Sequence, residues 1–211
     1  AERVMEGPAL PAANIVSPTV IGHDPAVKPD AFDPEGARKL LAEAGYPNGF
    51  ALTIATPNNR YINDEQLAQA VAQMFSRIGI ATKVEAMPLA VYFGKARNQE
   101  FGVALLGWGS LGADLALRAL ALTPNVDKGF GAWNWGRYSN PALDKLVETS
   151  LATVDPAKRE TAARAASAFA AREMVVIPIH YQVVTWAMRR SIDYTARVNE
   201  FTFAQHFKSS K

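Results

Sequence analysis

The sequence lacks cysteine, which excludes disulfide bonds, thiolate catalysis and cysteine-ligated metal sites. Its three histidines, His23, His180 and His206, form no recognisable metal-ligand spacing, so we interpret them as surface or packed side chains. No apolar run approaches the roughly 18 residues of a membrane-spanning helix. Residues 1–6 carry mixed charge without the apolar core of a signal peptide, which leaves the compartment open. We therefore expect no metal, no cofactor and, at most, a peripheral association with a membrane.

An excess of charge of one sign is also absent. The 211 residues include 22 Lys and Arg against 20 Asp and Glu, a formal net charge of +2, and the cations are scattered. Nucleic-acid binding needs a dense basic stripe, so the sequence predicts no nucleic-acid partner. Apolar residues make up 49% of the chain and charged residues 20%, which is typical of a globular protein with one large domain or two small ones.

Known catalytic motifs are absent as well. A nucleophile elbow, G-x-S-x-G, would need glycine two residues before Ser110, where Trp108 stands. The chain contains neither a phosphate-binding G-x-x-x-x-G-K-[ST] string nor the H-E-x-x-H pattern of zinc proteases. The acidic pair Asp64-Glu65 lies at the start of a predicted helix, where carboxylates favour the helix dipole. The sequence thus nominates no catalytic residue, and we expect a protein that is not an enzyme.

Hydrophobic periodicity predicts alternating strands and helices. Strands are expected at 50–56, 80–87 and 101–106, with amphipathic helices between them at 64–78 and 88–98. This order favours right-handed crossovers onto a parallel sheet, and the nearly continuous apolar run of the third strand favours a central position. The predicted fold class is α/β, with a mixed, mostly parallel sheet flanked by helices. Further helices are expected at 33–44, 114–122, 141–151 and 156–173, and further strands at 174–181 and 183–188.

A glycine-rich turn, G-W-G-S-L-G, follows the third strand. Glycines allow a turn where side chains would clash, a tryptophan suits a surface that grips a ligand, and open α/β sheets bind ligands at the carboxyl ends of strands. Gly107, Gly109 and Gly112 also spell G-x-G-x-x-G, with Asp127 about 20 residues beyond the first glycine, which favours a nucleotide-dependent enzyme. Residues 123–129 read as a loop rather than the second strand that such a fold requires, so this alternative is the weaker one.

Polar and aromatic side chains gather at three places: at Arg60-Tyr61, between Trp108 and Asp114, and at 133–135. A guanidinium can hold a carboxylate through two hydrogen bonds, and indole rings provide flat apolar walls. Backbone groups freed by the glycine turn can pair with an extended, peptide-like ligand. The candidate ligand-binding residues are Arg60, Tyr61, Trp108, Gly109, Ser110, Leu111, Asp114, Trp133 and Asn134.

Each of these groups also has a purely structural interpretation. Arg60 could pair with Asp64 on the surface, a contact that stabilises little. Trp108 could be a core residue wedged under the following helix. Trp133 and Trp135 alternate, so in an extended segment they face opposite sides and one of them packs.

Six short strings, in order along most of the chain, resemble a single family. They are D-P-x-x-A-x-x-L-L-x-x-A-G-Y at 33–46, I-G-I at 78–80, G-W at 107–108, Y-S-N-P-x-x-D at 138–144, D-P-A-K-R at 155–159 and I-P-I at 177–179. The chain resembles extracytoplasmic solute-binding proteins of the peptide and nickel type, family 5, which are the capture subunits of ABC importers. Six ordered matches are far more specific than any one of them.

The resemblance covers the C-terminal half of the family and implies one lobe of a two-lobed, type II periplasmic-binding-protein architecture. Residues 1–32 are then expected to be an extended segment near the hinge, 33–190 the α/β lobe, and 191–211 a tail that returns toward the missing N-terminal lobe. The implied function is non-catalytic capture of a peptide or other small polar solute in an inter-lobe cleft. The implied partners are ABC permease subunits and the N-terminal lobe of the same protein, and the implied location is the periplasm.

The ligand contacts of the family carry over unevenly. Leu111 stands where dipeptide-binding members have an aspartate that holds the amino group of the peptide, and Asp114 is the nearest acid. The run 112–114 is closer to the glutathione-import branch, whereas Arg60 stands where dipeptide binders have a carboxylate-binding arginine. The resemblance therefore implies a peptide or glutathione-like solute first, and another small polar solute second.

Overall fold

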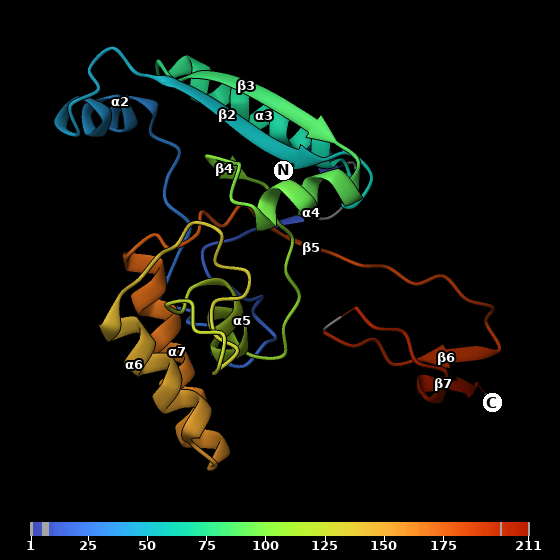
Figure 1. Cartoon of the computed structure of the whole chain (residues 1–211). Helices are drawn as coiled ribbons and strands as arrows, with labels where there is room; N and C mark the ends of the chain where they lie inside the picture. Colours follow the sequence, from blue (N-terminus) through green and yellow to red (C-terminus); the bar gives the residue numbers. More distant parts are fainter. Residues whose placement is uncertain (1, 6–8, 199, 211) are drawn as a thin grey trace. The chain divides into compact units, whose positions relative to one another are not determined.

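The computed structural model describes residues 2–5, 9–198 and 200–210. The chain folds as two compact units (Figure 1). Unit 1 comprises residues 1–7 and 30–107, and unit 2 comprises residues 8–29 and 108–211. Among the described residues, no helix has both the length and the apolar character needed to cross a membrane.

Unit 1 alternates strands and helices around a parallel sheet. Its elements are α1 (Glu2–Met5), α2 (Pro34–Glu43), β2 (Ala51–Pro57), α3 (Asp64–Arg77), β3 (Ala81–Met87), α4 (Leu89–Arg97) and β4 (Val103–Ala104). The strand order is β3-β2-β4, and both pairings are parallel. Helix α3 packs against β2 and β3, where Ile54 of the sheet meets Ala68 and Ala72 of the helix (Figure 1). The predicted α/β fold is confirmed.

The prediction of a long central strand at 101–106 is wrong. Only β4 pairs within this stretch, and it joins β2 at one edge of the sheet, so that β2 is the central strand. The apolar run has another cause, because the Phe101 ring stacks on Tyr92 of α4 with the ring centroids 5.3 Å apart. The apolar character that was attributed to flanking strands thus comes in part from the contact of Phe101 with α4, and in part from the packing of Val103 against the cluster of Ile54, Ala68 and Ala72.

Helix α2 begins as predicted. The Asp33 side chain accepts a hydrogen bond from the Gly36 N–H at 2.9 Å, and Pro34 occupies the first turn. Within the described part of the chain its apolar stripe is only partly covered: Ala37 and Leu41 are partly buried, Leu40 is 67% exposed, and no residue of α2 is fully buried. Capping and propensity, rather than burial, define this helix.

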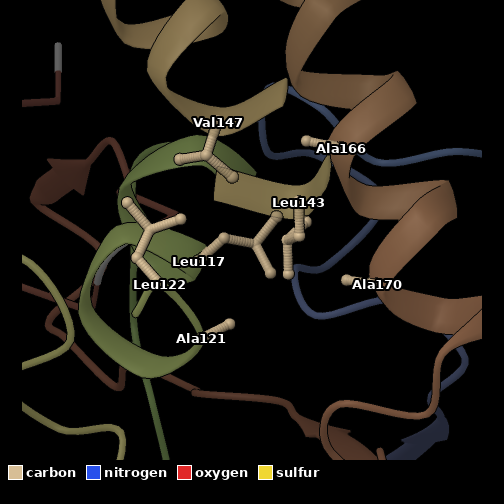
Figure 2. Close-up of a cluster of buried hydrophobic side chains, with 7 residues drawn as sticks. All are labelled: Leu117, Ala121, Leu122, Leu143, Val147, Ala166 and Ala170. Carbon is tan, nitrogen blue, oxygen red and sulfur yellow. The ribbon is translucent and has the colours of Figure 1, made fainter. Parts of the chain in front are cut away.

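Unit 2 packs three helices around one apolar cluster. Its elements are β1 (Ala9–Pro11), α5 (Ala113–Leu120), α6 (Pro141–Ala152), α7 (Pro156–Arg172), β5 (His180–Gln182), β6 (Ile192–Tyr194), η1 (Ala204–His206) and β7 (Phe207–Ser209). Asn140 and Asp155 cap α6 and α7, and each is followed by a proline, as predicted. Figure 2 shows side chains from α5 and its C-terminal end meeting those of α6 and α7. The cluster consists of Leu117, Ala121, Leu122, Leu143, Val147, Ala166 and Ala170.

The late strands differ from the prediction. Only His180 and Tyr181 of the strand predicted at 174–181 lie in β5. The strand predicted at 183–188 is wrong, because no described residue there lies in a strand. β5 pairs antiparallel with β1, which ends at Pro11, a residue with no N–H to donate to the ladder. β6 and β7 pair in a separate antiparallel hairpin that the sequence did not predict. The domain boundaries expected after residues 32 and 190 remain predictions.

The proline-rich segment before α2 is attached to unit 2 through Asn14, which is 2% exposed. Its Nδ2 donates to the carbonyls of Asp24 at 3.0 Å and Val27 at 3.4 Å. Its Oδ1 accepts the Asp24 N–H at 2.9 Å and the Ser167 hydroxyl at 3.3 Å. The Tyr181 hydroxyl accepts the Asn14 N–H and donates to the Asn14 carbonyl, both at 3.0 Å. Asn14 therefore connects two parts of the proline-rich segment with each other, and it connects the segment to α7 and to β5.

His180 gives unit 2 an expected pH dependence. Burial on β5 lowers the pKa of His180 below its ordinary value of 6.5. As the pH falls through the unfolded-state pKa, the unfolded chain binds more protons than the folded chain, so the free energy of unfolding decreases toward acid. We expect His180→Gln to flatten the fall in melting temperature between about pH 7.5 and about pH 5.5, followed by circular dichroism. A variant with the wild-type pH profile would contradict this assignment.

Candidate ligand-binding site

In unit 1, the loop after β2 presents Arg60 and Tyr61 on a fixed backbone. Asp64, at the start of α3, accepts the backbone N–H groups of both residues through Oδ2, each at 3.0 Å. Asn59 Oδ1 accepts the Leu89 N–H at 2.9 Å, which ties the loop to α4. Asp64 is 4% exposed, so its hydrogen bonds are shielded from water. The exposed Arg60 side chain thus extends from a well-anchored loop.

The Arg60 guanidinium lies over the Tyr61 ring, with Cζ 5.0 Å from the ring centroid. Asp64 binds backbone N–H groups, and no ion pair joins it to Arg60 among the described residues. The Tyr61 hydroxyl donates to the Gly107 carbonyl at 3.4 Å, and burial raises the pKa of Tyr61, which keeps this donor protonated. A Cβ at Gly107 would lie 2.6 Å from Tyr61 Cε1, so this contact requires glycine.

In unit 2, Trp108 is half-buried. It packs against a small buried apolar cluster, and its ring lies 5.3 Å from that of Trp133 at an interplanar angle of 64°. Edge-to-face geometry of this kind is favourable for aromatic pairs. The buried part of Trp108 agrees with its structural interpretation as a packed residue, and the functional interpretation as a ligand-gripping surface stays a prediction.

The turn after Trp108 has backbone groups available for a ligand. Within the described chain, the N–H groups of residues 108–111 have no hydrogen-bond partner. Gly109 is exposed, and Leu111 is 49% exposed. The Ser110 hydroxyl closes the turn by donating to the Gly112 carbonyl at 2.8 Å. Successive N–H groups on one turn suit the carbonyl oxygens of a peptide-like solute.

The loop after α5 brings Trp133 and Trp135 together. The Trp133 N–H donates to the Ala119 carbonyl at 2.9 Å, which ties the loop to the last turn of α5. The two indole centroids lie 5.5 Å apart at 41°. The expectation that the rings face opposite sides fails, because the segment turns instead of running extended and the Trp135 N–H bonds the Trp133 carbonyl at 2.9 Å. Together with Trp108 they form a row of three neighbouring indoles.

Asn134 holds this loop in shape. It is 5% exposed, and its Nδ2 donates to the Leu122 carbonyl at 3.0 Å and to the Tyr138 carbonyl at 2.7 Å. Its Oδ1 accepts the Tyr138 N–H at 3.0 Å. A solute would have to displace one of these bonds to reach the amide, so the structure shows Asn134 in an internal role within the loop.

Asp114 is fully buried in the first turn of α5. Its Oδ2 accepts hydrogen bonds from the Ser150 hydroxyl and from Arg159 Nε, both at 2.9 Å, and its Oδ1 accepts the Leu115 N–H at 2.8 Å. Both oxygens are therefore used inside unit 2, where they connect the start of α5 to α6 and α7.

The features expected of a dinucleotide site do not assemble around the glycine turn. Asn125 and Phe130 exchange backbone hydrogen bonds of 3.0 and 2.9 Å, so Asp127 lies in a tight loop rather than at the tip of a second parallel strand. Over the described ranges, no group of three or more His, Cys, Asp or Glu side chains could hold a metal ion.

Comparison with known proteins agrees with this geometry. Residues 1–117 match the model of the bacterial extracellular solute-binding proteins, family 5, middle. The chain belongs to this family. Glutathione-binding proteins GsiB from Shigella flexneri serotype 5b and Escherichia coli K12 are each 35% identical to it, over 82% of this chain and over 35% and 34% of their own lengths. The chain thus spans about a third of the curated relatives that it matches.

Solved structures show the same fold. HbpA2 from Haemophilus parasuis gives a TM-score of 0.85 at 21% identity, over 100% of this chain and 42% of its own. The ABC transporter-associated periplasmic binding protein DppA from Helicobacter pylori, in complex with the peptide STSA, gives a TM-score of 0.76 at 25% identity, over 85% of this chain and 35% of its own. GsiB and DppA are binding proteins, and the comparisons do not support the nucleotide-dependent alternative.

Several family 5 strings have structural roles that sequence reasoning missed. In Y-S-N-P-x-x-D, Asp144 accepts the Thr123 N–H at 3.0 Å and the Thr123 hydroxyl at 2.6 Å, which fixes the tryptophan-bearing loop to α6. The D-P-A-K-R string supplies Arg159, the partner of Asp114. These pairs are separated by 21 and 45 positions, and no local pattern connects them.

Proposed function

We propose that this chain is the C-terminal part of the substrate-binding component of an ABC importer, and that it captures a peptide or peptide-like solute in the periplasm. Membership of family 5 and the 35% identity to glutathione-binding proteins support this class of solute. The observation that carries the proposal is the turn at 108–111, where N–H groups without partners in the described chain stand beside a row of indoles.

In unit 2, the proposed contacts are the apolar faces of Trp108 and Trp133 and the backbone of Gly109, Ser110 and Leu111. Aromatic side chains contribute most when they are rigidly held, and both indoles are packed against neighbouring rings. Asp114 and Asn134 are proposed as internal supports of these contacts, because their polar atoms are already hydrogen-bonded.

In unit 1, Arg60 is the proposed ligand of a solute carboxylate. Its side chain carries no ion pair among the residues that the structure describes, and the Tyr61 ring orients it. A guanidinium of this kind can bind a carboxylate through two parallel hydrogen bonds. Its loop is anchored by Asp64, so little backbone order has to be acquired on binding.

The proposed partners are the permease subunits and the N-terminal lobe of the same protein. The tail from residue 191 carries aromatic side chains that are exposed here: Phe201 by 63%, Phe203 by 41% and Phe207 by 40%. Such side chains are costly in water and mark a surface that another part of a protein covers. We propose that the N-terminal lobe covers them.

Calorimetric titration of the full-length protein that contains this chain tests the proposed function. Glutathione and the dipeptide Met-Leu are the probes, and NAD tests the nucleotide-dependent alternative. We expect saturable binding of at least one peptide probe and none of NAD. Binding of NAD without binding of either peptide probe would overturn the proposal.

The Trp108→Ala variant tests the indole contact. In the full-length protein it should weaken binding of the peptide probe about 30-fold, because a well-packed aromatic contact contributes about 2 kcal/mol. Tyr46→Ala, which removes a half-exposed aromatic side chain outside the proposed contacts, is the control and should leave the affinity within about threefold of wild type. Equal losses in the two variants would remove Trp108 from the proposed site.

A further inference from the structure

Trp108 packs against a cluster of four buried residues of unit 2, which we name the Trp108 seat. They are Val16 and Val20, 5% and 7% exposed, and Ala113 and Ala116, which are both fully buried. The valines come from the proline-rich segment before α2, and the alanines from the first turns of α5. Trp108 packs against this cluster as a partly buried neighbour. The seat thus combines the first part of the chain with the helix that directly follows the turn.

Backbone contacts lock the two halves of the seat together. The Ile21 carbonyl accepts the Ala113 N–H at 2.9 Å, and Ile21 also pairs with Gly112 in a parallel bridge. Gly22 has φ of +84°, and a Cβ there would lie 2.7 Å from the Ala113 Cβ. Glycine is therefore required at this close approach, and the valine-bearing segment cannot shift without moving the start of α5.

The backbone carbonyl groups of Val16 and Val20 both contact His23. The His23 N–H donates to the Val20 carbonyl at 3.1 Å, and His23 Nδ1 lies 3.0 Å from the Val16 carbonyl. Asn14 closes the base of this loop through its two hydrogen bonds with Asp24. The valine side chains therefore project from a rigid loop rather than from a flexible linker.

The turn that carries Trp108 has no comparable internal support. Its N–H groups at 108–111 lack partners in the described chain, and Ser110 supplies the main contact inside the turn. The position of the indole therefore depends on the packing of its side chain against the seat and against Trp133. We infer that Val16 and Val20 are positioning residues for solute binding, acting through Trp108. This inference rests on the proposed function for its effect on affinity.

Fluorine NMR of the full-length protein labelled with 5-fluorotryptophan tests the seat, with the Trp108 resonance assigned through Trp108→Phe. Val20→Ala should shift or broaden this resonance and weaken the binding of glutathione, or of Met-Leu if glutathione does not bind, about tenfold. Val20→Ile retains the branched side chain and should behave like wild type. Val147→Ala removes the same atoms from a fully buried valine of the other cluster (Figure 2) and should change neither the resonance nor the affinity.

Equal effects of Val20→Ala and Val147→Ala on the Trp108 resonance and on affinity would overturn the inference. A Val20→Ala variant with an unchanged Trp108 resonance, or with a shifted resonance and wild-type affinity, would also overturn it. A wild-type protein that binds neither probe would count against the proposed function, and the fluorine resonances would then still decide whether the seat positions Trp108.

Discussion

Replacing Asp114 with alanine should lower the free energy of unfolding of unit 2 by about 2–4 kcal/mol. The carboxylate is fully buried and accepts hydrogen bonds from Ser150, Arg159 and Leu115. Its removal leaves the buried Ser150 hydroxyl with only a long contact of 3.4 Å to the Arg159 carbonyl, and it leaves the Arg159 guanidinium without its counter-charge. The Arg159 side chain is 37% exposed and can be partly rehydrated, so the loss should lie below that of a fully buried pair. Urea unfolding of the full-length protein, followed by circular dichroism, measures the change.

Two further variants separate the causes of this loss. Asp127→Ala removes an exposed carboxylate from the loop after α5 and should change stability by no more than about 0.5 kcal/mol. Asp114→Asn keeps an acceptor for Ser150 but removes the charge that faces Arg159, so its loss should be intermediate. If Asp114→Ala were no more destabilising than Asp127→Ala, the buried ion pair would not connect α5 to α7 in the way described.

Asn14→Ala should cost about 2–4 kcal/mol of the free energy of unfolding. Four groups lose a partner in this variant, namely the N–H and carbonyl of Asp24, the Val27 carbonyl and the Ser167 hydroxyl. Asn14→Asp has the same shape but cannot donate to the two carbonyls and places a charge beside them. It should therefore be at least as destabilising as the alanine variant. Chemical unfolding of the full-length protein again measures the effect.

Asn98→Ala is the matched control for Asn14. Asn98 is exposed after α4, where among the described residues its side chain bonds only the exposed Glu100 carboxylate, at 3.1 Å. Its replacement should change stability by no more than about 0.5 kcal/mol. A tolerated Asn14→Asp variant would show that the buried amide does not hold the proline-rich segment on unit 2.

The sequence predicted local structure well because local signals are self-contained. Asp33, Asn140 and Asp155, each followed by proline, marked three helix starts that the structure confirms. The strands were harder, because the length of a strand is set by its partner. β5 finds only three residues of β1 to pair with, and β1 lies at the other end of the chain, so no window of neighbouring residues contains that information.

In the candidate site, too, the features that depend on neighbouring residues were predicted, and those that depend on long-range contacts were not. The glycine turn located Trp108, because glycines and an indole after a strand are a local pattern. Val16 and Val20, in the cluster against which Trp108 packs, lie in a proline-rich segment without hydrophobic periodicity. Their burial therefore cannot be predicted from the sequence and is seen only in the fold. Asn134 and Asp114 were nominated by residue type. An amide or a carboxylate can either contact a ligand or hydrogen-bond to other parts of the fold. Which role applies depends on partners that lie as far as 45 positions away in the sequence, and a local pattern does not contain them.

The long-range pairing of β1 with β5 has a consequence for the order in which the nascent chain folds. Ribosomal synthesis delivers every residue of unit 1 before residue 108, so its local strand-helix contacts can form early. β1 and Asn14 are made first in unit 2, yet they must wait for Tyr181 before their pairing is complete. A chain arrested before that tyrosine should therefore be cut readily by protease between residues 9 and 29, while the sheet of β2 and β3 already resists digestion.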